Sequence, residues 1–181
     1  MKARVVKSRT IYRGRAVVLK LENLIEPGGV KAVREVVCHP GSVVLFPVRE
    51  DGRVLLVRQY RHAARQSLWE LPAGTLEPGE KPRHAAAREL IEETGYRARR
   101  LNLLCWFFPS PGILSEKMHL YSATDLSPAK ANPDSDELIK VQSFSSSELQ
   151  RMIQAGRIRD GKTLAGLLWL FGWLRKGPAP V

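Results

Sequence analysis

A charged segment at residues 81–94 constrains the fold most strongly. Pro82 stands near its start and Gly95 follows its end, which is the usual punctuation of an α-helix. On such a helix, spacings of i, i+3 and i+4 bring three carboxylates to one face: Glu89, Glu92 and Glu93. Like charges at this spacing cost about 0.2–0.5 kcal/mol per pair, so we expect positive charge to lie against this face.

Alternating apolar residues predict strands on both sides of this helix. Residues 3–38 are expected to form several strands, and the individual segments are residues 15–25, 30–39, 42–48, 53–61, 98–110, 117–126 and 139–145. The turn signals EPGG, at residues 26–29, and Asp51-Gly52 separate two pairs of them. Residues 67–80 contain many Pro and Gly residues, so we expect a loop there.

Two later segments are predicted to be helical. Residues 145–156 begin with serines that can cap a helix, carry Glu148 in the first turns and end at Gly156. A last helix is expected to begin near residues 160–168. One central and two late helices among many strands predict an α/β fold, with a mixed sheet covered by helices.

The composition favours a small anionic partner. The chain has 181 residues, a net charge of +11 and 44% apolar residues, which fits one globular domain and leaves room for a small appended subdomain. A pI near 10.1 favours nucleotides, phosphates or nucleic acid as partners. Because the positive charge is spread along the chain, we expect a small-molecule nucleotide rather than nucleic acid.

Cysteine usage and hydropathy bear on the compartment. Cys38 and Cys105 are far apart, and two buried free thiols suit a reducing cytosol. The apolar run at residues 164–174 is shorter than the roughly 20 residues that span a bilayer, so we expect a buried or dimer-contacting helix. We therefore expect a cytoplasmic protein without membrane association.

The acidic helix belongs to a longer spaced pattern. Gly74 is followed after five residues by Glu80, after seven more by Arg88-Glu89-Leu90, and then by Glu92-Glu93, Gly95 and Tyr96. This pattern resembles the signature of the Nudix hydrolases, GX5EX7REUXEEXGU. The resemblance implies a Nudix-type α/β/α sandwich with a mixed sheet.

The resemblance also implies a metal site with Mg²⁺, for which Mn²⁺ can substitute. Mg²⁺ prefers hard oxygen ligands and keeps positions for water and substrate phosphates, and metals stabilise charge that develops on a leaving oxygen. The implied metal ligands are the Ala73 carbonyl, Glu89, Glu92 and Glu93, and Glu92 is alternatively a base that orients water. Arg88 is implied to form a structural ion pair with Glu80.

Segments outside the signature resemble the ADP-ribose pyrophosphatase and nucleoside diphosphate sugar hydrolase branch of this family. They are VREVVCHPGSVV, VRQYRHAA, LWELPAGTLEPGE, PSPGILSE and GRIRDGKTLAGLL. This implies an N-terminal antiparallel-strand subdomain at residues 1–40, which forms a homodimer, and a hydrolase domain at residues 41–181. The implied substrate-binding residues are Arg34 and Glu35, which reach the partner's substrate, with Arg58, Arg61, Gly74, Pro111 and Gly112.

The general base stays open between two regions. Glu116 stands where the branch places an acidic residue near the metals, although Ile113 replaces the usual Phe. The loop PDSDE supplies the other candidates, Asp134, Asp136 and Glu137.

The expected reaction is hydrolysis of a nucleoside diphosphate derivative, with ADP-ribose as the first choice and AMP and ribose 5-phosphate as products. The alternatives are a broad nucleotide sugar hydrolase acting on GDP-mannose or ADP-glucose, a NADH or FAD pyrophosphatase, and a nucleotide sensor of Nudix fold. The complete carboxylate set favours an enzyme over a sensor.

Overall fold

The computed structural model describes residues 2–131 and 138–172. The chain divides into two compact units. One consists of Met1–Ser42 and Trp106–Met118, and the other of Val43–Cys105 and His119–Val181. The first unit thus contains a segment from the middle of the chain in addition to the N-terminal strands.

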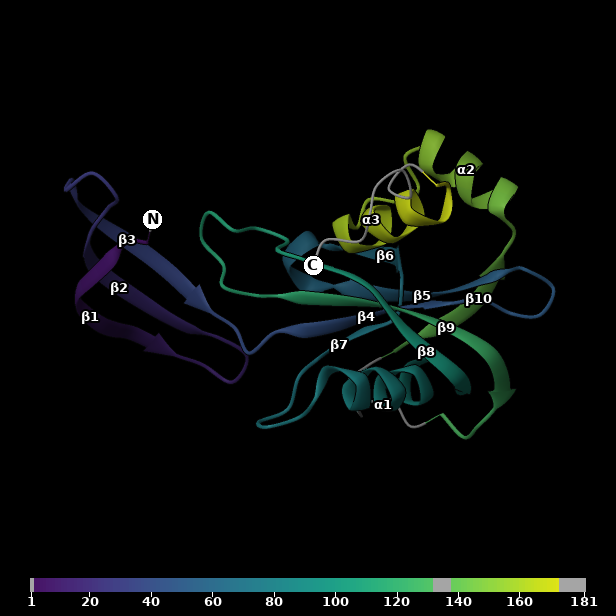
Figure 1. Cartoon of the computed structure of the whole chain (residues 1–181). Coiled ribbons are helices and arrows are strands. Elements are labelled where there is room, and N and C mark those ends of the chain that lie inside the picture. Colours follow the sequence, from purple (N-terminus) through teal and green to yellow (C-terminus); the bar gives the residue numbers. More distant parts are fainter. Residues whose placement is uncertain (1, 132–137, 173–181) are drawn as a thin grey trace. The chain divides into compact units, whose positions relative to one another are not determined.

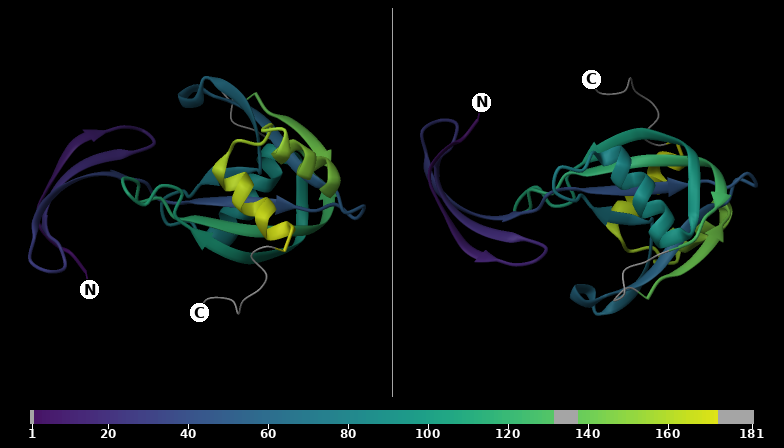
Figure 2. Two further views of the ribbon diagram at one scale, coloured as in Figure 1. Left: turned by 90° about the horizontal axis from the view of Figure 1, so that it is seen from above. Right: turned by 90° about the horizontal axis from the view of Figure 1, so that it is seen from below.

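The first unit contains a three-stranded antiparallel sheet in the order β1-β2-β3 (Figure 1). Its strands are β1 (Arg4–Arg13), β2 (Val18–Ile25) and β3 (Lys31–Cys38). In the predicted turn between β2 and β3, Gly28 and Gly29 have φ of 101° and 88°, which the absence of a Cβ permits. The predicted N-terminal antiparallel strands are therefore confirmed, and Figure 2 shows them curving together.

The middle segment of the first unit is bound to the end of β3. The Val37 N–H donates to the Ile113 carbonyl at 2.8 Å, and the Ser115 N–H donates to the Val37 carbonyl at 3.0 Å. Beside them, the His39 N–H donates to Ser115 Oγ at 3.0 Å. Backbone pairing thus holds residues 113–115 along the end of the strand.

The second unit is built on two sheets, whose strand orders are β10-β5-β6 and β7-β4-β9-β8. The strands are β4 (Ser42–Pro47), β5 (Val54–Arg61), β6 (Gln66–Glu70), β7 (Ala73–Thr75), β8 (Tyr96–Phe107), β9 (Met118–Pro128) and β10 (Lys140–Phe144), with a 3₁₀ turn at His62–Ala64. All six residues of β4 are buried. A strand buried on both faces needs a layer on each side.

Helices supply those layers. They are α1 (Pro82–Thr94), α2 (Ser146–Gln154) and α3 (Gly161–Leu170). Within this unit α1 covers one side of the sheets, and α2 and α3 cover the other (Figures 1 and 2). The predicted α/β/α arrangement is confirmed.

The helices pack on opposite faces of β4. On one face the core consists of Val43, Leu45, Ala85, Ala86, Leu90, Leu101, Tyr121 and Ala123. On the other, a Cβ built on Gly166 would approach Leu71 Cδ1 closer than 3.0 Å, so α3 lies directly against the chain that follows β6. The close approach depends on glycine at this position.

The helix ends follow the sequence signals. Pro82 begins α1, and Gly95 ends it with a φ of 70°. Ser145 caps α2 in a capping box with Glu148.

The loop prediction for residues 67–80 was wrong in part, because most of β6 and all of β7 lie in this segment. β6 pairs with β5 in a register that places Glu70 opposite Val57. The Pro and Gly residues lie mainly between and after the strands, so they interrupt pairing without abolishing it.

Cys38 and Cys105 are free, but they are half-buried rather than buried. None of the helices in the described part of the chain is long and apolar enough to cross a membrane.

Candidate active site

The acidic face of α1 and the segment around β7 line a polar pocket of about 340 Å³ in the second unit. The lining residues are Arg61, Ala73, Gly74, Thr75, Glu77, Arg88, Glu89, Glu92 and Glu93. Helical periodicity brings the carboxylates together, and β7 brings backbone groups to them.

Arg88 is the cation that meets the acidic face. Its Nη1 donates to Glu89 Oε1 at 2.6 Å and to Glu92 Oε2 at 2.9 Å. Its Nε and Nη2 donate to the two carboxylate oxygens of Glu80 at 3.1 and 2.9 Å. The hydrogen bonds between Arg88 and Glu80 are the largest cause of both pKa shifts: they raise the pKa of Arg88 and lower the pKa of Glu80. Sequence reasoning paired Arg88 with Glu80 and missed its contacts to the neighbouring carboxylates.

Two of the carboxylates contact the backbone of β7. Glu93 is 5% exposed, and its Oε2 accepts a hydrogen bond from the Ala73 N–H at 3.0 Å. Glu89 lies so close to Gly74 that a Cβ there would approach its carboxylate closer than 3.0 Å. The φ of Gly74 lies outside the left-handed region, so glycine is required here by space and not by backbone strain.

The donor set fits a hard divalent cation. Glu89, Glu92 and Glu93 offer carboxylate oxygens, and the gap that Gly74 leaves holds the carboxylate of Glu89 against the backbone. Within the described residues, no group of three acidic, His or Cys side chains is already arranged around a common point. Arg88 engages Glu89 and Glu92, which are two of the candidate ligands.

The structure separates the two predicted arginines of β5. Arg61 lines the pocket and donates from Nε and Nη2 to Glu70 at 2.9 and 2.8 Å. Arg58 is exposed, pairs in register with Trp69 and Lys140, and is not among the lining residues. Residues three apart on a strand point to opposite faces, which explains the separation.

Glu70, the partner of Arg61, is a buried carboxylate. It is 1% exposed, and it is also hydrogen-bonded to Lys162. Burial by itself would raise the pKa of Glu70, but the hydrogen bond from Arg61 and the charge of Lys162 outweigh burial and lower it. The carboxylate is therefore ionised and neutralised by two cations.

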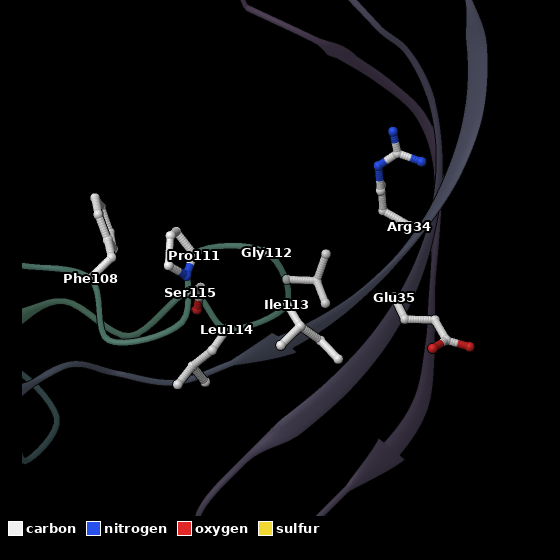
Figure 3. A pocket seen from close by; sticks show the side chains of 9 residues that line it. Arg34, Glu35, Phe108, Pro111, Gly112, Ile113, Leu114 and Ser115 are labelled. Atoms are coloured by element: carbon white, nitrogen blue, oxygen red, sulfur yellow. The ribbon is translucent and has the colours of Figure 1, made fainter. Parts of the chain in front are cut away.

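A second pocket, of about 570 Å³, lies within the first unit (Figure 3). The lining residues are Arg34, Glu35, Val36, Phe108, Pro111, Gly112, Ile113, Leu114 and Ser115. The side chains of Arg34 and Glu35 diverge from adjacent positions on β3 (Figure 3). Arg34 donates to Glu26 Oε1 at 2.7 Å. The structure thus brings together four predicted substrate-binding residues in one concave surface: Arg34, Glu35, Pro111 and Gly112.

The base candidates differ in what the structure shows. Glu116 is 9% exposed, accepts a hydrogen bond from Ser42 Oγ at 2.8 Å and lies 3.5 Å from His39 Nδ1. The loop candidates Asp134, Asp136 and Glu137 lie outside the described residues.

Sequence reasoning missed Thr75 and Glu77 in the pocket, and Glu70 and Lys162 behind Arg61. A signal for Glu70 was available, because a carboxylate within the apolar run LWELP needs a buried partner. Nothing local identified Lys162 as that partner.

Comparison with known proteins identifies the family. The family model for the NUDIX domain matches residues 39–167, which is more than half of the chain. The chain belongs to the Nudix hydrolase family. The resemblance drawn from residues 74–96 is therefore confirmed.

Relatives of this Nudix hydrolase include pyrophosphatases of nucleotide derivatives. It is 33% identical over 172 residues to the ADP-ribose pyrophosphatase of Bacillus subtilis, covering 94% of this chain and 93% of that protein. It is 34% identical over 154 residues to the GDP-mannose pyrophosphatase of Yersinia enterocolitica, covering 78% and 80% of the two chains. A crystal structure of an ADP compounds hydrolase matches with a TM-score of 0.83 at 25% identity, covering 97% of this chain and 95% of that one. This chain is thus a Nudix pyrophosphohydrolase related to ADP-ribose pyrophosphatases, and the family implies a nucleotide-type substrate and typically a divalent metal.

Proposed function

We propose that this Nudix pyrophosphohydrolase hydrolyses ADP-ribose to AMP and ribose 5-phosphate with Mg²⁺, for which Mn²⁺ can substitute. The observation that carries the proposal is the contact of Glu89 and Glu93 with the backbone at Gly74 and Ala73, which concentrates oxygen donors in one pocket. The match to an ADP-ribose pyrophosphatase over 93% of that protein's length supports the choice of substrate.

The metal would be held by Glu89, Glu92, Glu93 and the Ala73 carbonyl. When bound, a divalent cation neutralises a diphosphate and stabilises charge on the leaving oxygen. Arg88 holds Glu89 and Glu92 in place and keeps the loop at Glu80 on α1 through its ion pair. Arg61 presents a guanidinium to the pocket from β5, in a position suited to phosphate oxygens, while Glu70 fixes its orientation.

We propose that the general base is one of the loop acids Asp134, Asp136 and Glu137. Glu116 is 9% exposed and its carboxylate accepts a hydrogen bond from Ser42, which favours a role in holding residues 109–116 in place. Glu116 and Glu92 are the alternatives. Alanine substitution of each acid, with the pH profile of kcat as readout, separates these candidates because only loss of the base removes the limb that it titrates.

Substrate binding would involve Gly74 and Arg61 in the active-site pocket, Arg58 on the opposite face of β5, and the pocket of the first unit. Arg34, Glu35, Pro111 and Gly112 would bind the nucleotide, with Arg34 and Glu35 acting on the substrate of a partner subunit. Residues 1–40 would form the homodimer, and residues 41–181 the hydrolase domain. Exposed apolar side chains on β1 and β3 support a contact with a second copy: Val5, Val6, Tyr12 and Val33 are 49–60% exposed. The free cysteines fit a reducing compartment such as the cytoplasm.

A panel of substrates tests the proposal. Phosphate release through a coupled phosphatase is measured with ADP-ribose, ADP-glucose, GDP-mannose, NADH, FAD and dNTPs, in Mg²⁺ and in Mn²⁺. A preference of at least tenfold in kcat/KM for ADP-ribose, or about 1.4 kcal/mol, is expected. Glu93→Gln serves as the blank for contaminating activity.

GDP-mannose is the second candidate, because relatives that act on it match most of the chain. Equal or faster turnover of GDP-mannose and ADP-glucose would replace the proposal by a broad nucleotide sugar hydrolase. Faster turnover of NADH or FAD would replace it by a dinucleotide pyrophosphatase. No turnover of any compound with either metal would indicate a nucleotide sensor.

A further inference from the structure

A buried polar cluster lies at the N-terminus of α3, and its members contact the residues that lead into the active-site pocket. Asp160 caps the helix, and its Oδ2 accepts from the Thr163 N–H at 3.0 Å and from the Thr163 hydroxyl at 2.6 Å. Lys162 lies 3.1 Å from Asp160 Oδ1 and is also hydrogen-bonded to Glu70. Thr163 is 0% exposed and Lys162 is 9% exposed, so this is an interior arrangement.

Thr163 links the helix to the backbone that follows β6. The hydroxyl proton of Thr163 is directed to Asp160, which leaves its oxygen as an acceptor, and the Leu71 N–H donates to that oxygen at 2.7 Å. Residues 71 and 163 are 92 positions apart in the sequence. Gly166, one turn further along α3, lets the helix approach the Leu71 side chain.

The same short segment is held from the other side of the sheet by α1. Two residues after Leu71, the Ala73 N–H donates to Glu93, and between them the Pro72 carbonyl accepts from the Leu45 N–H at 2.8 Å. α3 therefore holds one end of residues 70–74, and α1 holds the other end. The position of the Ala73 carbonyl and of Gly74 depends on both ends.

Lys162 acts on the pocket by a second route. Glu70 orients Arg61 through two hydrogen bonds, and Lys162 supplies the other cation against the same carboxylate. Asp160 balances the charge of Lys162. The start of α3 thus fixes both the backbone and a guanidinium of the pocket without lining it.

We propose that Asp160, Lys162 and Thr163 are positioning residues for hydrolysis, which hold residues 70–74 and Arg61 in the geometry of the transition state. The proposal rests on the proposed function for its kinetic part only. Because an error of about 1 Å in the placement of reacting groups can cost about 100-fold in rate, the loss of one anchor should lower kcat more than it alters KM.

Thr163→Val tests the proposal, because valine keeps the shape of the side chain and cannot accept from the Leu71 N–H. We expect faster amide hydrogen exchange in the peptide covering residues 68–75, and kcat for ADP-ribose at least tenfold lower with KM changed less than threefold. Thr163→Ser, which keeps the hydroxyl, should restore both. Lys162→Gln is the second variant, for use if Thr163→Val does not fold, and it should lower kcat by the same criterion.

Ser145→Ala is the matched control, since it removes the cap of α2, which lines neither pocket. It should lower the urea midpoint without changing kcat or exchange in residues 68–75. The proposal is overturned if Thr163→Val leaves that exchange unchanged, if exchange rises equally throughout the second unit, or if Ser145→Ala lowers kcat as much. If ADP-ribose is not hydrolysed, kcat and KM are measured with the best substrate of the panel instead. If no compound of the panel is hydrolysed, the amide hydrogen exchange of residues 68–75 alone decides whether α3 positions this segment.

Discussion

Replacing Gly74 by alanine should abolish most activity while leaving the protein folded. A Cβ at this position would lie closer than 3.0 Å to Glu89 Cδ and to both of its carboxylate oxygens, whereas ordinary contact begins at 3.4 Å. The carboxylate must therefore retreat by more than the 0.4 Å difference between these two distances or adopt another rotamer. Either change disturbs its 2.6 Å hydrogen bond to Arg88.

The expected losses in activity and stability differ in size. A displacement on the order of 1 Å in a catalytic group costs about 100-fold in rate, or about 2.8 kcal/mol. Overpacking costs about 1–3 kcal/mol in a closed core, but Glu89 lies at the edge of a pocket and can turn outward, so the lower end applies. A Gly to Ala change recovers about 0.4–1 kcal/mol from the unfolded chain. Net stability should therefore change by less than about 1 kcal/mol.

Urea unfolding and kcat/KM for ADP-ribose measure the two effects. Gly161→Ala is the matched control, because nothing lies within 4 Å of a Cβ built there. If Gly74→Ala acts through Glu89, adding it to Glu89→Ala should cost little more. The reasoning is refuted if Gly74→Ala keeps more than a third of wild-type kcat/KM, or if its effect adds fully to that of Glu89→Ala.

Three further predictions concern charged groups. Glu93→Gln should lower turnover by at least about 100-fold with little change in the urea midpoint, since a ligand to a metal that provides several kcal/mol would lose its charge. The pKa of Glu70 in the folded state lies below 4.5, the value expected in the unfolded chain. The ionised Glu70 carboxylate therefore contributes fully to the free energy of unfolding above pH 4.5. This contribution is lost as the pH falls through the folded-state pKa. The stabilities of the wild type and Glu70→Gln should therefore converge as the pH is lowered from 7 to 3. Arg34→Ala should raise KM for ADP-ribose with kcat changed less than about threefold, as expected for a contact made equally in the ground state and the transition state.

Each of these has its own control. The control for Glu93→Gln is Glu50→Gln at an exposed position, which should leave turnover unchanged. Near-normal turnover of Glu93→Gln would remove Glu93 from the metal site. A stability difference for Glu70→Gln that stays constant between pH 7 and 3 would mean that ionised Glu70 does not stabilise the fold. Lys31→Ala, on the same strand as Arg34, should not raise KM. An unchanged KM for Arg34→Ala would remove the first-unit pocket from nucleotide binding.

Local signals carried most of the prediction of the fold. Pro82, Gly95 and the serine cap of α2 mark helix ends because they act on the backbone within one turn, and the Asp51-Gly52 hairpin acts over the same range. The limits of such signals appear at residues 67–80. There the breakers are visible in the sequence, but pairing of β6 with β5 depends on the register of another strand.

The sequence by itself determined the family and the acidic face of α1, since these follow from fixed spacing. Patterns with helical or strand period predicted a mixed sheet covered by helices, and the resemblance to the family implied the α/β/α layering. Only the tertiary structure decided that Arg88 meets three carboxylates, that Arg61 rather than Arg58 lines the pocket, and that Glu70 and Leu71 are held by Lys162 and Thr163. The last two contacts join residues 92 positions apart. Their partners are selected by how a helix packs on a strand, and no local pattern of residues encodes that choice.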